Sequence, residues 1–182
     1  MEQSYTVTSD TLAAIDLARY LDSAGGGRGV SFGVTRDSAQ EVLEQANVIA
    51  FGNHATLYPF RDYLKIVNFS LGPEELYVQN AHPAHGEPER YALVTEGKDR
   101  RIEPSILALM PGQAPGHQLM LLESRHPSAL VAMLDSSKGE GALEQLLREH
   151  HSPEFFEAVI LSEIDGNTVL RSWPVALHPV QK

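Results

Sequence analysis

The sequence predicts an α/β fold: a three-layer sandwich with a mainly parallel sheet, a β-rich insertion in about residues 65–104 and a C-terminal β-hairpin. Two observations support this class. Segments with the periodicity of strands alternate with segments of helical periodicity, which is typical of right-handed βαβ units. The segment "NVIAF" (47–51) is apolar on both faces, as a strand covered on both sides must be.

The N-terminal part of the chain is expected to alternate three strands with two helices. Tyr5–Ser9 is the first strand, and Asp10 is the N-cap of a helix that ends in the glycines of "SAGGGRG". The second strand is "VSFGVT" (30–35). The segment "RDSAQEVLEQA" then forms the second helix and leads into "NVIAF", the third strand.

The β-rich insertion follows a short helix expected at Phe60–Leu64. Its strands are "KIVNFS", "ELYVQN" and "RYALV", which are separated by glycine, proline and charged residues. The strand and helix pattern then resumes, with strands at 106–110 and 117–124 and a helix that has Pro127 in its first turn.

A C-terminal hairpin is expected at 153–180, after an amphipathic helix at 141–150. The turn Asp165-Gly166-Asn167 between apolar strands is a hairpin signal. The hairpin has more apolar side chains than a lone edge hairpin should leave exposed. These are Phe155, Phe156, Val159, Ile160, Val169, Leu170 and Trp173. We therefore expect the hairpin either to cover the sheet edge or to pair with a second chain in a homodimer.

Composition limits the class of protein. The 182 residues are expected to form one domain (1–182), and the net charge of −10, spread along the chain, argues against non-specific nucleic-acid binding. The lack of cysteine excludes disulfides, thiol catalysis and cysteine-ligated zinc. No apolar run is long enough for a membrane span, and no signal peptide is in view. A cytoplasmic location is favoured, with an extracytoplasmic one open if an anchor was removed.

Four segments together resemble known modules: the run from Thr6 to Arg19, "VIAFGN", "GEPERYALV" and "LALMPGQAPGHQLMLLES". They are similar to α/β modules of unknown function in multi-domain regulatory proteins of soil bacteria, which look like one lobe of a periplasmic binding protein. The resemblance covers most of the chain and implies this fold and a modular context. It supplies no activity and no functional residue.

Three motifs receive structural interpretations. "GVSFG" (29–33) fits the pattern G-x-S-x-G, but Ser31 falls inside a strand rather than on a strand-to-helix turn. "GGGRG" (25–29) follows a helix and precedes a strand, which is the wrong order for a phosphate-binding loop. His82 and His85 lie near Glu87, but Pro83 prevents a helical frame and no third His or Asp lies close by. We therefore expect no metal and no cofactor.

The best candidate site lies where predicted parallel strands end. In such sheets, ligands bind outside the carboxyl ends of the strands. The polar residues that follow or end these strands are Ser9, Asp10, Asn53, His54, Glu123, Ser124, Arg125 and His126. We expect them to converge on one crevice that binds a small polar or anionic ligand. Arg125 could hold a carboxylate or phosphate, and Asp10 could orient His54 or pair with Arg125.

The sequence contains no activated nucleophile, no carboxylate pair at a telling spacing and no set of metal ligands. We therefore expect a sensory, ligand-binding or interaction module of a larger bacterial regulatory protein, without catalysis. The alternatives are a small hydrolase or lyase that uses His54 or His126 as general base, and an oligomerisation module built on the C-terminal hairpin.

Overall fold

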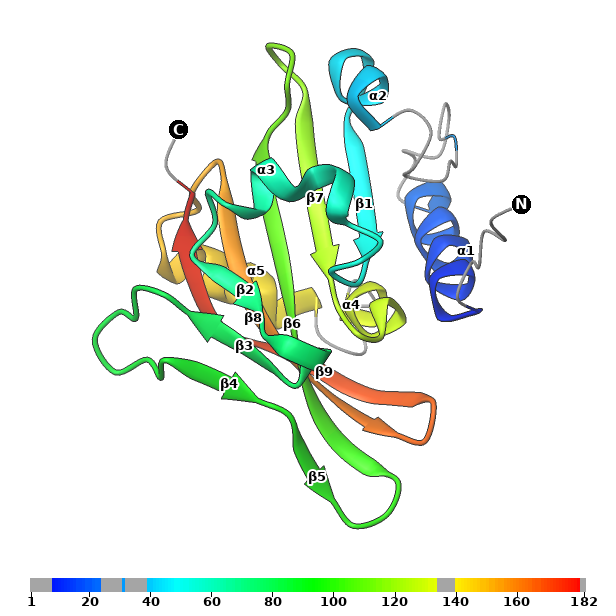
Figure 1. The fold of residues 1–182 in the computed structure, drawn as a ribbon, viewed down its shortest axis with the longest axis vertical. Helices are drawn as coiled ribbons and strands as arrows, with labels where there is room; N and C mark the ends of the chain where they lie inside the picture. Colours follow the sequence, from blue (N-terminus) through cyan, green and yellow to red (C-terminus); the bar gives the residue numbers. More distant parts are fainter. Residues whose placement is uncertain (1–7, 24–30, 32–38, 134–139, 181–182) are drawn as a thin grey trace.

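The computed structural model describes residues 8–23, 31, 39–133 and 140–180. The fold is broadly α/β, as predicted, with one mixed sheet of six strands in the spatial order β1-β7-β6-β8-β9 and β5 paired with β6 (Figure 1). Along the chain these strands are β1 (Val48–Gly52), β5 (Val94–Glu96), β6 (Arg100–Pro111), β7 (Gln118–Glu123), β8 (Phe156–Asp165) and β9 (Thr168–Pro179). The long strand β6 lies in the middle, between β7 and β8.

The prediction of a mainly parallel sheet is wrong for the strands that the structure describes. Only β1 and β7 are parallel, whereas β5–β6, β6–β7, β6–β8 and β8–β9 are antiparallel. The reason is the length of the connections. Residues 112–117 join β6 to β7, and residues 166–167 join β8 to β9. A parallel crossover needs about a dozen residues or more, so both connections are hairpin turns.

Residues 65–104 form strands, as predicted. β2 (Phe69–Leu71), β3 (Tyr77–Asn80) and β4 (Arg90–Ala92) make a separate antiparallel sheet, with the 3-10 helix η2 (Pro73–Glu75) between β2 and β3. This small sheet packs on the main sheet through the buried side chains of Phe69 and Val78. These two side chains pack in one cluster with the buried residues Ile106 and Val159 of the main sheet.

The described helices are α1 (Thr8–Ser23), α2 (Ala39–Gln45), η1 (Tyr58–Phe60), α3 (Arg61–Leu64), α4 (Pro127–Met133) and α5 (Glu140–Glu149). None of them is long and apolar enough to cross a membrane. The expected strand end at Ser9 is wrong, because Ser9 and Asp10 lie inside α1. The helix begins at Thr8, so its first turn includes both residues. Residues 5–7 and the expected strand 30–35, apart from Ser31, lie outside the described residues.

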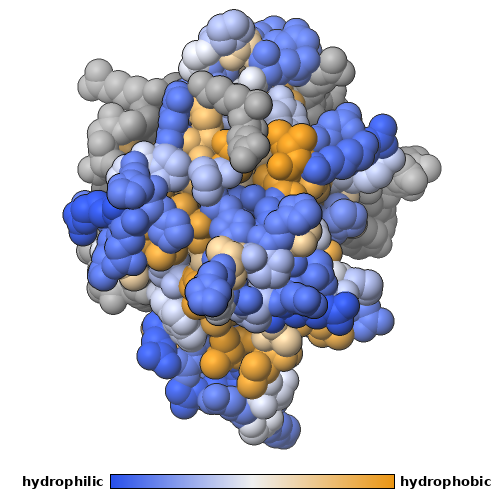
Figure 2. Space-filling view, turned by 90° about the vertical axis from the view of Figure 1, so that its left-hand side faces the viewer, coloured by the Kyte–Doolittle hydropathy of each residue, from blue (hydrophilic) through white to orange (hydrophobic). Residues whose placement is uncertain are grey.

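Elements pack on both faces of the main sheet. On one face, α1, α4 and α5 cover a cluster that includes Leu107, Leu122 and Ile160. On the other face, α2, η1 and α3 cover Met110 and Leu121, next to the small sheet. The hydrophobic residues visible in Figure 2 reach the surface in separate small groups among hydrophilic ones.

The C-terminal hairpin is present, with Asp165 paired to Thr168 across the turn. Gly166 has φ +57°, a conformation that suits a residue without Cβ in such turns. Most of its apolar residues face the chain's own core. Phe155, Phe156, Val159 and Ile160 are buried, and Val169 and Trp173 are half-buried. Leu170 is exposed.

Candidate functional site

The parallel pairing of β1 with β7 brings two of the predicted segments to one end of the sheet. Gly52 pairs with Glu123, and the Ser124 amide donates a hydrogen bond of 2.9 Å to the Gly52 carbonyl. Asn53 and His54 follow β1 directly, and Ser124, Arg125 and His126 follow β7 directly. The two segments therefore start side by side at the carboxyl end of both strands.

The turn after β1 is held by its own side chains. The Asn53 carboxamide oxygen accepts hydrogen bonds from the amides of Ala55 and Thr56, at 3.1 and 3.0 Å. Gly52 has φ +150°, and a Cβ there would lie 2.0 Å from Thr56 Oγ1. Leu57, fully buried, anchors the end of the turn in the core. His54 is thus held in a hydrogen-bonded turn, with most of its side chain in solvent.

Glu123, the last residue of β7, is the unusual group of this site. Only 2% of Glu123 is exposed, and its Oε1 has no hydrogen-bond partner among the described residues. His54 Nδ1 lies 3.4 Å from Oε1, which is longer than a charge-assisted hydrogen bond, and the His54 side chain is 68% exposed. Burial raises the pKa of Glu123, and the charge of Glu75 adds to this, while His54 opposes it. The carboxyl group is therefore buried but poorly compensated.

Ser124 and His126 belong to a different group of contacts. Ser124 Oγ lies 2.7 Å from Ser105 Oγ and accepts a hydrogen bond of 3.0 Å from the His126 amide. His126 Nδ1 lies 2.6 Å from Oε2 of the buried Glu103, whose Oε1 accepts a hydrogen bond from Arg101 Nε. Burial alone would raise the pKa of Glu103, but hydrogen bonds and charges from His126 and Arg101 outweigh it, and the pKa is lowered.

These two groups lie on opposite faces of the sheet. Successive residues of a strand point to opposite sides. Leu121, two residues before Glu123, packs with Leu57 and η1, whereas Leu122 packs with α1 and α4. Glu123 and His54 therefore lie on the face of η1 and the small sheet, and Ser124 lies on the face of α4.

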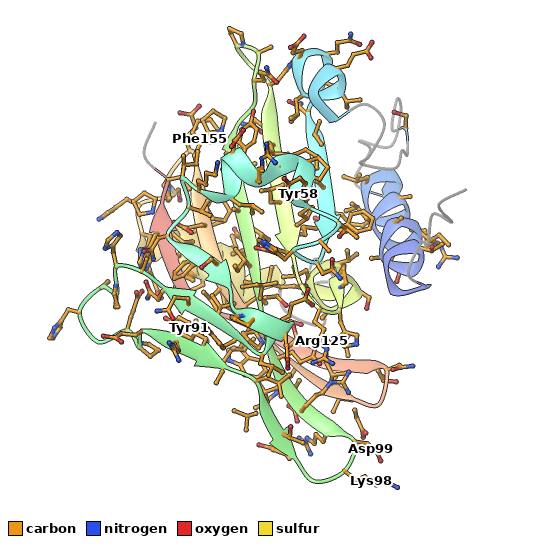
Figure 3. All side chains as sticks on the ribbon, in the orientation of Figure 1. Tyr58, Tyr91, Lys98, Asp99, Arg125 and Phe155 are labelled. Atoms are coloured by element: carbon orange, nitrogen blue, oxygen red, sulfur yellow. The ribbon has the colours of Figure 1, made fainter. Side chains whose placement is uncertain are left out.

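For the other predicted site residues, Arg125, Ser9 and Asp10, the described contacts include none with His54, Glu123, Ser124 or His126. Arg125 is exposed just after β7, and Figure 3 shows it toward the opposite end of the sheet from Phe155. Ser9 and Asp10 lie in the first turn of α1, and their side chains are outside the described part of the chain. Of the predicted residues, the structure thus brings His54 next to Glu123, and it hydrogen-bonds the His126 amide to Ser124.

Sequence reasoning missed Arg101, Glu103 and Ser105, which belong to the first half of β6. In a parallel sheet these residues would lie at the end away from His126. Because β6 runs antiparallel to β7, Ile106 pairs with Glu123, and the start of β6 reaches the site. The signal in the sequence was the alternation of Arg101, Glu103 and Ser105 with other residues just before the apolar run 106–110, in "RIEPSILALM".

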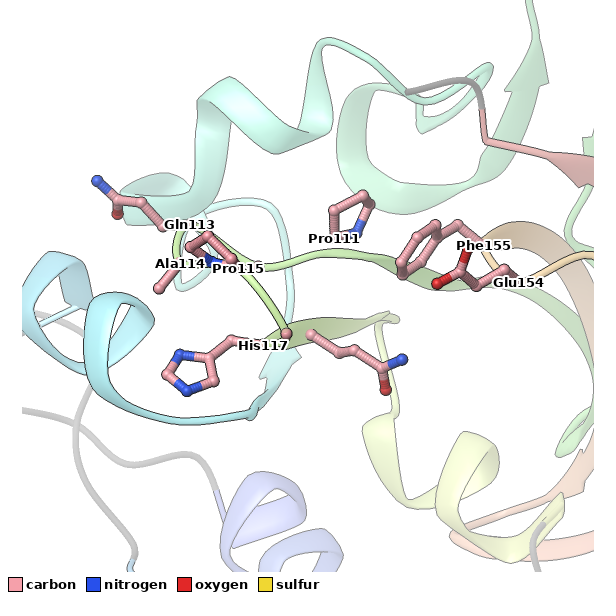
Figure 4. A pocket seen from close by; sticks show the side chains of 10 residues that line it. Pro111, Gln113, Ala114, Pro115, His117, Glu154 and Phe155 are labelled. Carbon is pink, nitrogen blue, oxygen red and sulfur yellow. The ribbon is translucent and has the colours of Figure 1, made fainter.

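Two surface hollows lie elsewhere, beside the loop between β6 and β7. One, of about 420 Å³, is lined by residues 111–118 with Glu154 and Phe155 (Figure 4). The His117 ring points away from Phe155 in this view, and its Nδ1 is buried without a hydrogen-bond partner in the described chain. The other, of about 430 Å³, is lined by Leu43, Pro59, Asp62, Tyr63, Ile66 and Gln113. Neither hollow includes a predicted site residue.

The part of the chain that the structure describes contains no group of three His, Asp or Glu side chains that could hold a metal ion. No family model, curated protein or solved structure matches the chain. The fold and the site therefore define an α/β protein with a buried carboxyl group beneath an exposed histidine at the carboxyl end of two parallel strands. Any functional assignment rests on this geometry.

Proposed function

We propose that the chain is a sensory, ligand-binding or interaction module of a larger bacterial regulatory protein, and that it binds a small polar ligand beside His54 and Glu123 without turning it over. The single observation that carries this proposal is the buried Glu123 Oε1 without a hydrogen-bond partner in the described chain. We also propose that the fold is a three-layer sandwich with the main sheet in the middle. This is supported by the elements that pack on both faces of that sheet.

The physical reason is the cost of an uncompensated buried carboxyl group. A buried polar atom without a hydrogen bond costs about 1–3 kcal/mol, and more if it is charged. A ligand with an N–H or O–H group can supply the missing donor. His54, whose side chain is mostly in solvent, can turn aside and open the way to Glu123 without disturbing the core. Arg125, exposed at the end of the same strand, can hold a carboxylate or phosphate of the ligand.

A thermal-shift screen tests this proposal. The panel contains primary amines, amino acids, hydroxy acids and inorganic phosphate. We expect at least one compound to raise the melting temperature of the wild-type protein and to leave that of Glu123→Gln unchanged. Glu89→Gln, which alters an exposed carboxylate, is the matched control and should respond like the wild type. Equal shifts in wild type and Glu123→Gln, or no shift with any compound, would contradict binding at Glu123.

A hydrolase or lyase is the second candidate, and one observation favours it. His54 and His126 both turn Nδ1 toward a buried glutamate, and this arrangement orients a histidine that acts as general base. However, Ser124 and Ser105 Oγ bond to each other, so neither serine is aimed at a histidine ring as a nucleophile. Turnover of an ester, phosphate or glycoside substrate that disappears in both His54→Ala and His126→Ala would favour this candidate over a binding module.

Oligomerisation through the C-terminal hairpin remains a third proposal. The four buried residues at the start of the hairpin cover the chain's own core, so they support the covering role. For a homodimer, the exposed Leu170 and the outer edge of β9 would be the contact surface.

A further inference from the structure

A second polar cluster lies where the small sheet meets the main sheet, away from His54 and Glu123. It consists of Asn68, Asn80, Glu87 and His178, which we call the latch. Asn68 directly precedes β2, Asn80 ends β3, Glu87 lies in the segment 81–89 before β4, and His178 is near the end of β9. Neither proposed catalysis nor the proposed ligand site uses these residues.

Each member of the latch is hydrogen-bonded to another. Asn68 Nδ2 lies 3.1 Å from His178 Nδ1 and donates a hydrogen bond of 2.7 Å to Asn80 Oδ1. Asn80 Nδ2 donates to Glu87 Oε2 at 3.0 Å. His178 Nε2 lies 2.8 Å from the same Glu87 oxygen. The latch therefore links the residue before β2, β3, the segment 81–89 and β9 in a closed ring of contacts.

Backbone groups fix the orientation of both carboxamides. The His82 amide, which can only donate, lies 2.6 Å from Asn68 Oδ1, so that atom must be the oxygen. The Pro88 carbonyl, which can only accept, lies 3.3 Å from Asn80 Nδ2, so that atom must be the nitrogen. Asn68 therefore presents N–H to His178. Since both hydrogens of this amide are donors, His178 Nδ1 accepts, and its proton is on Nε2.

This orientation of Asn68 fits only the neutral form of the His178 imidazole. A protonated His178 would carry an N–H at Nδ1, opposite the N–H of Asn68. Turning the Asn68 carboxamide over in place would set its N–H against the His82 amide and its oxygen against Asn80 Oδ1, so the carboxamide must leave this position and give up the His82 amide. The contact between His178 Nε2 and Glu87 needs no change, because Nε2 carries a proton in both states.

Two carboxylates face His178 from the elements packed against it. Glu87 lies in the segment 81–89, and its pKa is lowered: burial opposes this, but hydrogen bonds from Ala84, Asn80 and His178 outweigh it. Glu157 is the cross-strand neighbour of His178 on β8, and burial raises its pKa. Glu157 accepts hydrogen bonds from the amides of Asn68 and Phe69, at 2.7 and 2.8 Å. A positive charge on His178 would lower the pKa of both carboxylates.

We infer that the latch is a pH-sensitive switch: protonation of His178 displaces the Asn68 carboxamide and frees the His82 amide, while the Ala81 amide stays bonded to the Asn68 carbonyl and Glu87 stays bonded to His178. Histidine is the side chain whose charge ordinarily changes between pH 5 and 8. The switch is independent of the proposed ligand site, and a sensory module could use it to respond to acidification. The switch should free the His82 amide and not the Ala84 amide, because the Ala84 amide donates to Glu87 Oε2 at 3.0 Å and not to Asn68.

Residue-resolved hydrogen exchange from pH 7.5 to 5.5 tests the switch. We expect the protection factor of the His82 amide to fall by about tenfold or more between pH 7.5 and 5.5, the range in which the charge of histidine ordinarily changes. The Ala84 amide should keep its protection over the same range. A parallel loss at both amides, or no change at His82, would overturn the proposal.

Two variants separate the switch from a general loosening. In His178→Gln, the side-chain oxygen can accept from Asn68 and the nitrogen can donate to Glu87, which copies the neutral imidazole without its titration. We expect His82 to stay protected in this variant at pH 5.5. His85→Gln removes an exposed histidine of the same segment and should leave the wild-type response intact. A wild-type pH response in His178→Gln would place the titrating group elsewhere.

Discussion

Glu123→Gln is expected to raise the free energy of unfolding at pH 8 by about 1–3 kcal/mol, because it removes a buried negative charge that no described donor compensates. Because burial raises the pKa of Glu123 in the folded state, the ionised carboxylate lowers stability at any pH above that pKa. Below the ordinary carboxyl pKa, the group is protonated in both folded and unfolded chains. The gain should therefore be largest in alkali and should vanish as the pH falls below about 4.5.

Chemical denaturation at a series of pH values measures this gain. Glu89→Gln, an exposed carboxylate, should change the free energy of unfolding by no more than about 0.5 kcal/mol at every pH. If Glu123→Gln instead destabilises the protein at pH 8, then the contact with His54 stabilises the carboxylate more than burial penalises it. A stabilising variant that has also lost ligand binding would be the pattern of a functional site, where stability has been given up for activity.

Arg101→Met is expected to lower the free energy of unfolding by about 3 kcal/mol at neutral pH, which is typical when one partner of a buried ion pair is removed. Arg101 donates to the buried Glu103, and it also donates to the Gly166 carbonyl at 2.8 Å. The lowered pKa of Glu103 means that its carboxylate stabilises the fold above the ordinary carboxyl pKa. This stabilisation is lost as the pH falls through the folded-state pKa, so the cost of the substitution should shrink in acid.

A double-mutant cycle identifies the partner. In a Glu103→Gln background, Arg101→Met should cost clearly less, because the charge that Arg101 compensates is gone. Arg90→Met is the matched control, since Arg90 is exposed, lies over the Tyr77 ring and bonds Gln79. Its removal should cost about 1 kcal/mol or less. An equal cost of Arg101→Met in both backgrounds would mean that Arg101 acts through the hairpin turn at Gly166.

The fold was predictable where local signals decide the outcome. The turn at Asp165-Gly166-Asn167 follows from residues that accept a tight hairpin, and the apolar segment 47–51 contains most of the strand β1. Strand direction was not predictable from periodicity, because an apolar run is the same read in either direction. The length of the connection at 112–117 does indicate that β6 and β7 are antiparallel, since a segment this short cannot form a parallel crossover.

The site was predictable in part for the same reason. His54 and Glu123 could be placed together because both stand at the carboxyl ends of neighbouring parallel strands. The contact of His126 with Glu103 depends on an antiparallel register that no local pattern reveals. The latch depends on still longer pairings, since Asn68 and His178 are 110 residues apart in the chain. Such contacts are set by tertiary packing and not by sequence neighbours.

The parallel pairing of β1 with β7 has a consequence for the order of folding. Residues 53–117 all lie between these two strands, so their pairing must close a long loop, whereas β8 and β9 meet across a short turn at 166–167. Loop closure costs entropy before the contacts are gained, and distant pairings therefore form slowly. The β6–β7 and β8–β9 hairpins can assemble first as a template, with β1 added to the edge of β7 at the end. The pair of His54 and Glu123 would then be among the last features to form in each newly made chain.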